Sequence, residues 1–188
     1  MTILVDHPDP WIGIPEDFPN EGWQSAAEWA AELVDVLGEE LPPPTEGQKR
    51  QLAEYLTTVA ESRAQRNASR IFVSVDGWAG PVYIADLVVL MGVSSAEVTL
   101  EQLDGSQDPD AVEKPIIQPF VTESGLEGIY SVRYLNPPDV GGLLARADYL
   151  WPMPTGFLQL FTAQFDLVAF ERVLPRLAAL ASTVSVVS

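Results

Sequence analysis

The chain of 188 residues contains no cysteine, and its 27 acidic and 10 basic residues give a formal net charge of -17. The length suits a single domain over residues 1–188 with its own apolar core. Without cysteine there can be no disulfide, cysteine nucleophile or cysteine-ligated zinc. We expect a cytoplasmic protein, because neither a signal peptide nor an apolar run of about 20 residues is present.

The acidic residues concentrate in two stretches. Residues 1–48 contain eleven carboxylates and no Lys or Arg, and residues 97–113 are again rich in Asp and Glu. Such a surface repels phosphate groups, which excludes binding to nucleic acids and to anionic membranes. It permits a basic protein partner, although solubility alone also accounts for it. The excess of Arg over Lys, eight to two, is typical of a GC-rich bacterial genome.

The first element is WIGIPEDFPNEGW, residues 11–23, which has a tryptophan at each end. Its start can extend as an edge strand, and Pro15 and Pro19 then turn the chain because proline disfavours helix in the preceding residue. We expect Trp11 to pack from the strand and Trp23 to cover apolar surface just before the first helix. The segment therefore predicts a structural wrap rather than a binding surface.

Two helices follow, each opened by a capping box in which a Ser or Thr pairs with a residue three positions later. Ser25 opens the first, over residues 25–38, and Gly38 supplies its stop. Thr45 opens the second, which runs to about Arg66. Their inward faces should hold Trp29, Leu33, Val36 and Leu37 in the first helix, and Leu52, Tyr55, Leu56 and Val59 in the second.

From Arg70 onward, β-branched and aromatic residues predict strands. Three hairpins are expected, with turns at DGWAG, at residues 124–125 and at residues 154–156. A last helix begins after Asp166, and Pro175 should kink or divide it. The predicted fold class is α+β, an α-β-α sandwich in which an antiparallel sheet of about six strands is packed by the N-terminal helices and a C-terminal helix.

Few residues are suited to catalysis. The one histidine, His7, lies near an end of the chain that we expect to be mobile, and one histidine cannot complete a zinc site or a well-placed triad. The segment DGSQDPDAVEKP begins like an EF-hand loop, but Pro109 and Pro115 replace the required Gly and Glu, so an exposed acidic loop is expected. We assign no catalytic residue, metal ligand or cofactor.

Three large apolar side chains near predicted turns are candidates for binding a partner: Trp78, Trp151 and Met153. Such side chains either anchor an interface or fold back to cap the open end of a sheet. The acidic loop supplies three more candidates, which could contact a basic partner: Asp104, Asp108 and Asp110.

Both ends of the chain resemble the PsbP-like superfamily. WIGIPEDFPNEGW resembles that family's opening strand with its Ile-Pro exit, and GFLQLFTAQFDLVAFERVLPRLAALASTVSV resembles its closing strand, acidic turn and amphipathic helix. The superfamily, which includes LpqN-type lipoproteins, forms an α-β-α sandwich and mostly binds other proteins without catalysis. The resemblance implies the same here. It transfers no functional residue, and it implies no lipid anchor because this chain has no cysteine.

The function expected from these observations is that of a non-enzymatic acidic protein-binding domain, of the adaptor, chaperone or inhibitor type, with a basic or amphipathic partner. One alternative is a carboxylate-based enzyme such as a hydrolase, with or without a divalent metal. Another is a self-associating structural subunit that forms a homo-oligomer.

Overall fold

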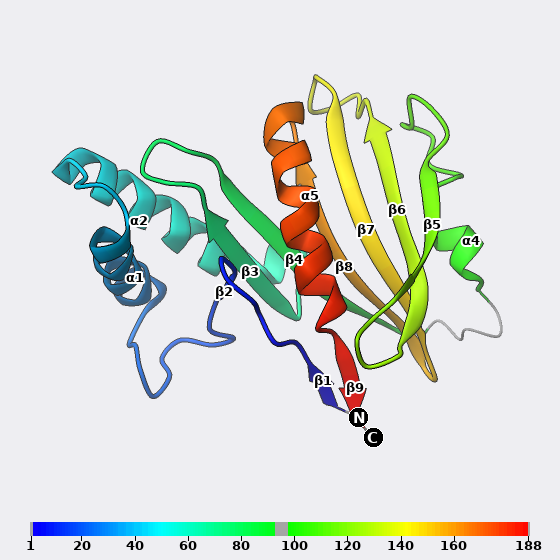
Figure 1. The fold of residues 1–188 in the computed structure, drawn as a ribbon, viewed down its shortest axis with the longest axis horizontal. Helices are drawn as coiled ribbons and strands as arrows, with labels where there is room; N and C mark the ends of the chain where they lie inside the picture. The colour runs from blue at the N-terminus through cyan, green and yellow to red at the C-terminus, as the bar shows by residue number, and fades with distance from the viewer. Residues whose placement is uncertain (1, 93–97, 188) are drawn as a thin grey trace.

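The computed structural model describes residues 2–92 and 98–187. Within these ranges the chain forms five helices and nine strands (Figure 1). The helices are α1 (Ala26–Glu40), α2 (Glu46–Glu61), α3 (Arg63–Arg66), α4 (Leu100–Leu103) and α5 (Leu167–Ser182). The strands are β1 (Thr2–Leu4), β2 (Ile12–Gly13), β3 (Arg70–Val75), β4 (Val82–Met91), β5 (Ile116–Val121), β6 (Glu127–Leu135), β7 (Leu144–Met153), β8 (Gly156–Gln164) and β9 (Ser185–Val187).

The α+β class is confirmed. Over the described residues the main sheet has seven antiparallel strands, not about six, in the order β2-β3-β4-β8-β7-β6-β5. The three predicted hairpins are present as β3-β4, β5-β6 and β7-β8. The pairing of β4 with β8, which joins the first hairpin to the last, was not predicted.

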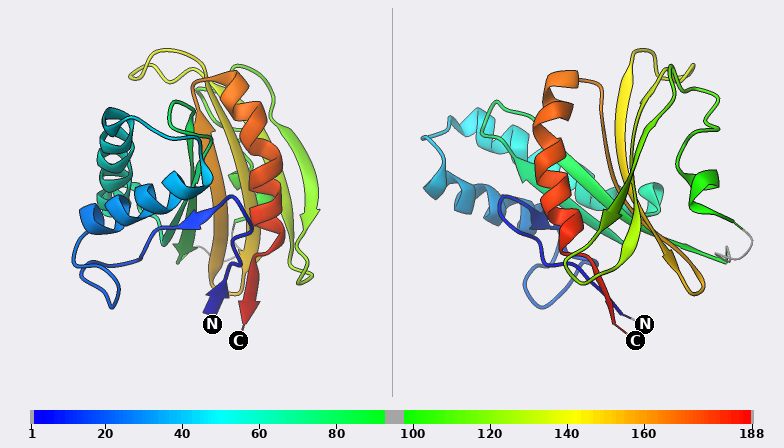
Figure 2. Two further views of the ribbon diagram at one scale, coloured as in Figure 1. Left: turned by 60° about the vertical axis from the view of Figure 1, so that its left-hand side comes forward. Right: turned by 45° about the vertical axis from the view of Figure 1, so that its right-hand side comes forward.

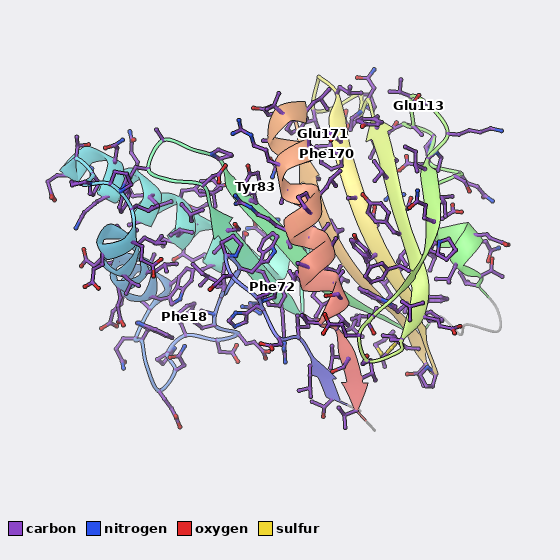
Figure 3. The ribbon with its side chains drawn as sticks, in the orientation of Figure 1. Phe18, Phe72, Tyr83, Glu113, Phe170 and Glu171 are labelled. Atoms are coloured by element: carbon purple, nitrogen blue, oxygen red, sulfur yellow. The ribbon has the colours of Figure 1, made fainter. Side chains whose placement is uncertain are left out.

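Helices cover both faces of the sheet, as an α-β-α sandwich requires. Alternate side chains of a strand point to opposite faces. On β3, Phe72 packs in a core cluster with α5, whereas Ile71 and Val73 pack with α1 and α2 in a second cluster. The left view of Figure 2 shows α1 and α2 on one side of the sheet and α5 on the other, and Figure 3 labels Phe72, Tyr83 and Phe170 of the α5 cluster.

Local signals placed the helix starts correctly. The Ser25 side chain accepts a hydrogen bond from the Glu28 backbone, and the full capping box of Thr45 and Gln48 is present. Gly38 does not end α1, which continues to Glu40, so that prediction was wrong. The second predicted helix breaks at Ser62, and a short helix, α3, follows. The Ser62 hydroxyl donates a hydrogen bond to the Val59 carbonyl at 2.7 Å.

Three other expectations are corrected. Tyr55 and Val36 do not face inward, because 44% and 51% of their surface is exposed. The last helix, α5, begins after the Asp166 cap as predicted, but it runs unbroken through Pro175.

Over the described residues, no helix is long and apolar enough to cross a bilayer.

The N-terminal segment wraps around the molecule. Trp11 is 2% exposed, and its Nε1 donates a hydrogen bond to the Arg176 carbonyl of α5 at 2.8 Å. Trp23 is half-buried, and its Nε1 donates to Glu32 Oε2 at 2.8 Å. The predicted edge strand and the packing of both tryptophans are therefore confirmed. The chain end before them was expected to be mobile, but β1 pairs with β9, so the two ends of the chain lie side by side (Figure 1).

The segment after β4 differs in part from the expected exposed loop. Glu97 and the four residues before it lie outside the described residues, and α4 follows. The Asp104 side chain is buried, and its backbone carbonyl accepts a hydrogen bond from Ser131 Oγ at 2.6 Å. This loop packs on β6 because the Ala111 backbone also bridges to Leu135.

Candidate functional site

A hollow on the described surface lies between α1 and the N-terminal arm, which we define as residues 7–13. Two adjoining cavities of about 480 and 230 Å³ share Ile12, Leu33 and Val36. All views place the arm between α1 and α5 (Figures 1 and 2). We call the combined hollow the α1 groove. Its α1 wall consists of Trp29, Glu32, Leu33, Val36, Leu37 and Glu40, and its arm wall of His7, Asp9, Pro10, Ile12 and Gly13; Trp23, Leu41 and Val75 complete the lining.

A row of carboxylates borders this groove. The five acidic residues of α1 are all exposed: Glu28, Glu32, Asp35, Glu39 and Glu40. Four of them recur at spacings of four, three and four residues, which places them within an arc of about 60° on the helix. Among the described residues, only Asp35 of this group has a salt-bridge partner, Lys49 at 2.9 Å. The outer face of α1 is therefore strongly negative.

Most basic residues are paired with carboxylates of the same chain. Seven of the ten form ion pairs with carboxylates: Lys49, Arg66, Arg70, Arg133, Arg146, Arg172 and Arg176. Arg63 instead donates to the backbone carbonyls of Ile14, Pro15 and Ser69. The surface therefore keeps few cations to neutralise its carboxylates.

A second candidate site is a charged belt on the sheet face opposite α5. We define the belt as Arg66, Asp86, Arg146, Asp148, Arg133 and Asp108. At its centre Asp148 is 1% exposed and accepts hydrogen bonds from Arg146 Nη2 at 2.8 Å and from Gln159 Nε2 at 2.7 Å. Arg133 Nη2 lies 3.3 Å from the same carboxylate, and the Arg146 guanidinium lies 4.0 Å above the Phe161 ring. These contacts place two guanidinium groups and an amide against the Asp148 carboxylate.

One end of the belt lies in a cavity of about 270 Å³ between α2 and the sheet, lined by Tyr55, Phe161 and Phe165 among others. Asp86 is 3% exposed there, and its Oδ2 accepts a hydrogen bond from Arg66 Nη1 at 2.8 Å. Its Oδ1 is buried without a hydrogen-bond partner among the described residues. Burial raises the pKa of Asp86, and the charges of Arg66 and Arg146 oppose this only in part.

The aromatic candidates from the sequence do not form a surface site. Trp151 and Met153 lie inside strand β7 and are buried in the core cluster under α5. Trp78 is half-buried, packs against the α1-α2 cluster, and donates from Nε1 to the Pro42 carbonyl at 2.7 Å. The interface alternative is therefore corrected for Trp151 and Met153, which are core residues of β7, whereas Trp78 folds back onto the α1-α2 cluster, the other alternative.

The acidic candidates are also largely structural. Asp104 Oδ1 accepts from the Ser106 backbone at 2.7 Å, and Asp108 Oδ1 accepts from the Asp110 backbone at 3.1 Å. Asp108 also lies 4.0 Å from Arg133 Nε. Asp110 is half-buried, and its carbonyl binds the Asn136 backbone. Over residues 2–92 and 98–187, no group of three or more His, Asp or Glu side chains is placed to hold a metal ion.

Of the belt residues, only Asp108 was a candidate from the sequence, and none of the other five was. A usable signal was present, because Asp86 interrupts the apolar run YIADLVVL, and Arg146 and Asp148 interrupt LLARADYLW. Charged residues inside strands that should be buried require partners there. Arg146 and Asp148 are also two positions apart, so both point to the same face.

Comparison with known proteins adds no assignment: no family model matches the chain, and no curated protein matches it significantly.

Proposed function

We propose that this protein is a non-enzymatic acidic binding domain, of the adaptor, chaperone or inhibitor type, that engages a basic or amphipathic protein. The observation that supports this proposal most directly is the row of exposed carboxylates on α1. Most of these carboxylates have no cationic partner within the described residues. Unscreened surface charge of one sign attracts and orients a partner of the opposite sign. The resemblance to the PsbP-like superfamily supports a binding role, and the composition without cysteine supports a reducing compartment such as the cytoplasm.

The test is affinity capture from the source organism's extract at about 50 and 500 mM salt, a range over which exposed charges become strongly screened. We compare the wild type with a triple variant on α1, Glu32→Gln, Glu39→Gln and Glu40→Gln. The control triple removes the same charge elsewhere: Glu54→Gln, Glu61→Gln and Glu113→Gln. One protein should be retained at low salt by the wild type and the control, and lost with the α1 triple. Equal retention by both triples, or no salt-sensitive partner at all, would contradict the proposal.

A carboxylate-based hydrolase is the second candidate, and Asp86 is the observation that favours it. A buried carboxyl group with a raised pKa in a cavity beside an arginine is a common feature of acid-base sites. If the site used a divalent metal, millimolar Mg²⁺, Ca²⁺ or Mn²⁺ would raise the melting temperature of the wild type and not of Asp86→Asn. Light scattering during size exclusion tests the remaining alternative, a self-associating subunit.

A further inference from the structure

We propose that the α1 groove is the docking site for an amphipathic α-helix of the partner protein, in which Lys and Arg flank an apolar row. This inference rests on the proposed function, because it states where a basic partner binds and in what form.

The groove has an apolar floor arranged at helical spacing. Trp29, Leu33, Val36 and Leu37 line it from α1, and Ile12 and Val75 line it from the arm and β3. From Trp29 to Glu40 the α1 wall spans eleven residue steps, which is about 16 Å or three helical turns. A helix laid along it would present anchors at positions i, i+3, i+4 and i+7 to this floor.

Val36 is an apolar side chain of the groove that remains largely exposed to water in the free chain. It projects from the middle of α1, is 51% exposed, and lines both cavities of the groove. Covering such a side chain with an apolar partner is favourable because it removes hydrocarbon surface from water. Leu33 and Leu37 beside it are half-buried, so the same partner would complete their burial.

The charge of both walls selects the partner. Glu32 and Glu40 line the groove from α1, and Asp9 lines it from the arm. Neither residues 2–13 nor residues 26–40 contain a Lys or Arg. A neutral or acidic helix would leave these carboxylates uncompensated, whereas lysines flanking an apolar row would lie against them. A second copy of this chain is disfavoured, because it would bring its own net charge of -17.

The experiment measures the binding of two fluorescent peptides by anisotropy at low and high salt. Both contain about 18 residues of Leu, Ala and Lys in the same composition, which equalises their charge and helix propensity. In one peptide the leucines form a single face, and in the other their order is scrambled. Each is titrated into the wild type, Val36→Asp and Val168→Asp. Val168 is the matched control, an exposed valine on a helix outside the groove.

The wild type should bind the amphipathic peptide at least about 10-fold more tightly than the scrambled one, a difference that a few buried leucines supply. Val36→Asp should reduce that preference to less than about 3-fold even though it adds negative charge, and Val168→Asp should retain it. If the wild type binds both peptides with equal affinity, or if the two variants show the same preference between the peptides, the groove proposal is overturned. The proposed function as an acidic binding domain would still hold in that case. If neither peptide binds even at low salt, the proposed function fails as well.

Discussion

Asp148 makes the strongest residue-level prediction because its charge is almost completely removed from water. Asp148→Asn preserves the shape but leaves Arg133 and Arg146 without the carboxylate that they share. Breaking a buried ion pair on one side typically costs about 3–5 kcal/mol, so we expect the free energy of unfolding to fall by about that amount. Urea unfolding at pH 7 measures it. Asp139→Asn, in the exposed β6-β7 loop, should stay within about 0.5 kcal/mol of the wild type.

Asp86 and Asp76 should affect the pH dependence of stability with opposite signs. Burial raises the pKa of Asp86, so the folded protein holds this proton more tightly than the unfolded chain does. Stability from this group therefore falls as pH rises from about 4, the unfolded value, through the folded pKa. At Asp76 a hydrogen bond from Arg176 at 2.6 Å lowers the pKa. Its contribution is present above about pH 4 and is lost as pH falls through the folded pKa.

The measurement compares unfolding free energies of the wild type, Asp86→Asn and Asp76→Asn across acidic pH. The advantage of the wild type over Asp86→Asn should shrink with rising pH, and its advantage over Asp76→Asn should grow. Because Asp76 is exposed, we expect its effect near neutral pH to be only about 1 kcal/mol. If the difference in unfolding free energy between wild type and variant changed with pH in the same direction for both variants, burial would not be the main influence on the pKa of Asp86.

The residue scale also shows where sequence reasoning is reliable. The capping box of Thr45 and Gln48 could be predicted because both partners are local. The roles of Asp86 and Asp148 could not, since Arg66 and Arg133 reach them from other elements of the fold. Trp151 became a candidate because it lies just before the turn at residues 154–155, but it belongs to strand β7 and its neighbours in space belong to the core.

Among the elements, α5 tolerates a proline in its interior. Pro175 has no backbone N–H to donate to the carbonyl four residues earlier, and its ring crowds that carbonyl. Pro175→Ala should raise the free energy of unfolding by about 2 kcal/mol, because a helix-propensity gain of about 3 kcal/mol exceeds the added entropy of the unfolded chain, about 1 kcal/mol. Thermal unfolding followed by circular dichroism measures the change. Pro43→Ala, in the exposed loop after α1, should give no such increase.

The elements themselves were largely predictable, and their arrangement was not. Each hairpin has a local turn signal, and each long helix has a cap in the sequence. The contact of β4 with β8 and that of β1 with β9 join segments far apart in the chain, and many such pairings satisfy the same apolar pattern. The α1 groove was missed for this reason, because its two walls meet only after the arm folds back.

For the whole molecule, the charge of -17 should weaken the folded state through self-repulsion. Salt screens exposed charges more than buried pairs, and the screening length falls from about 30 Å at 0.01 M to about 3 Å at 1 M. We therefore expect the melting temperature to rise between 20 and 500 mM NaCl, as measured by calorimetry. The triple variant Glu32→Gln, Glu39→Gln and Glu40→Gln should show a smaller rise. A melting temperature that falls with salt would mean that attractive surface pairs dominate instead.

The hydrogen bond from Trp11 to the Arg176 carbonyl has a consequence for biosynthesis. Its two partners are 165 residues apart in the chain. At about 5–20 residues per second, a ribosome needs on the order of 10–30 s to add that length. During this interval α1 and α2 can already associate, but the arm has no α5 to receive its indole. The wall of the groove that the arm provides is therefore completed only after α5 has been synthesised.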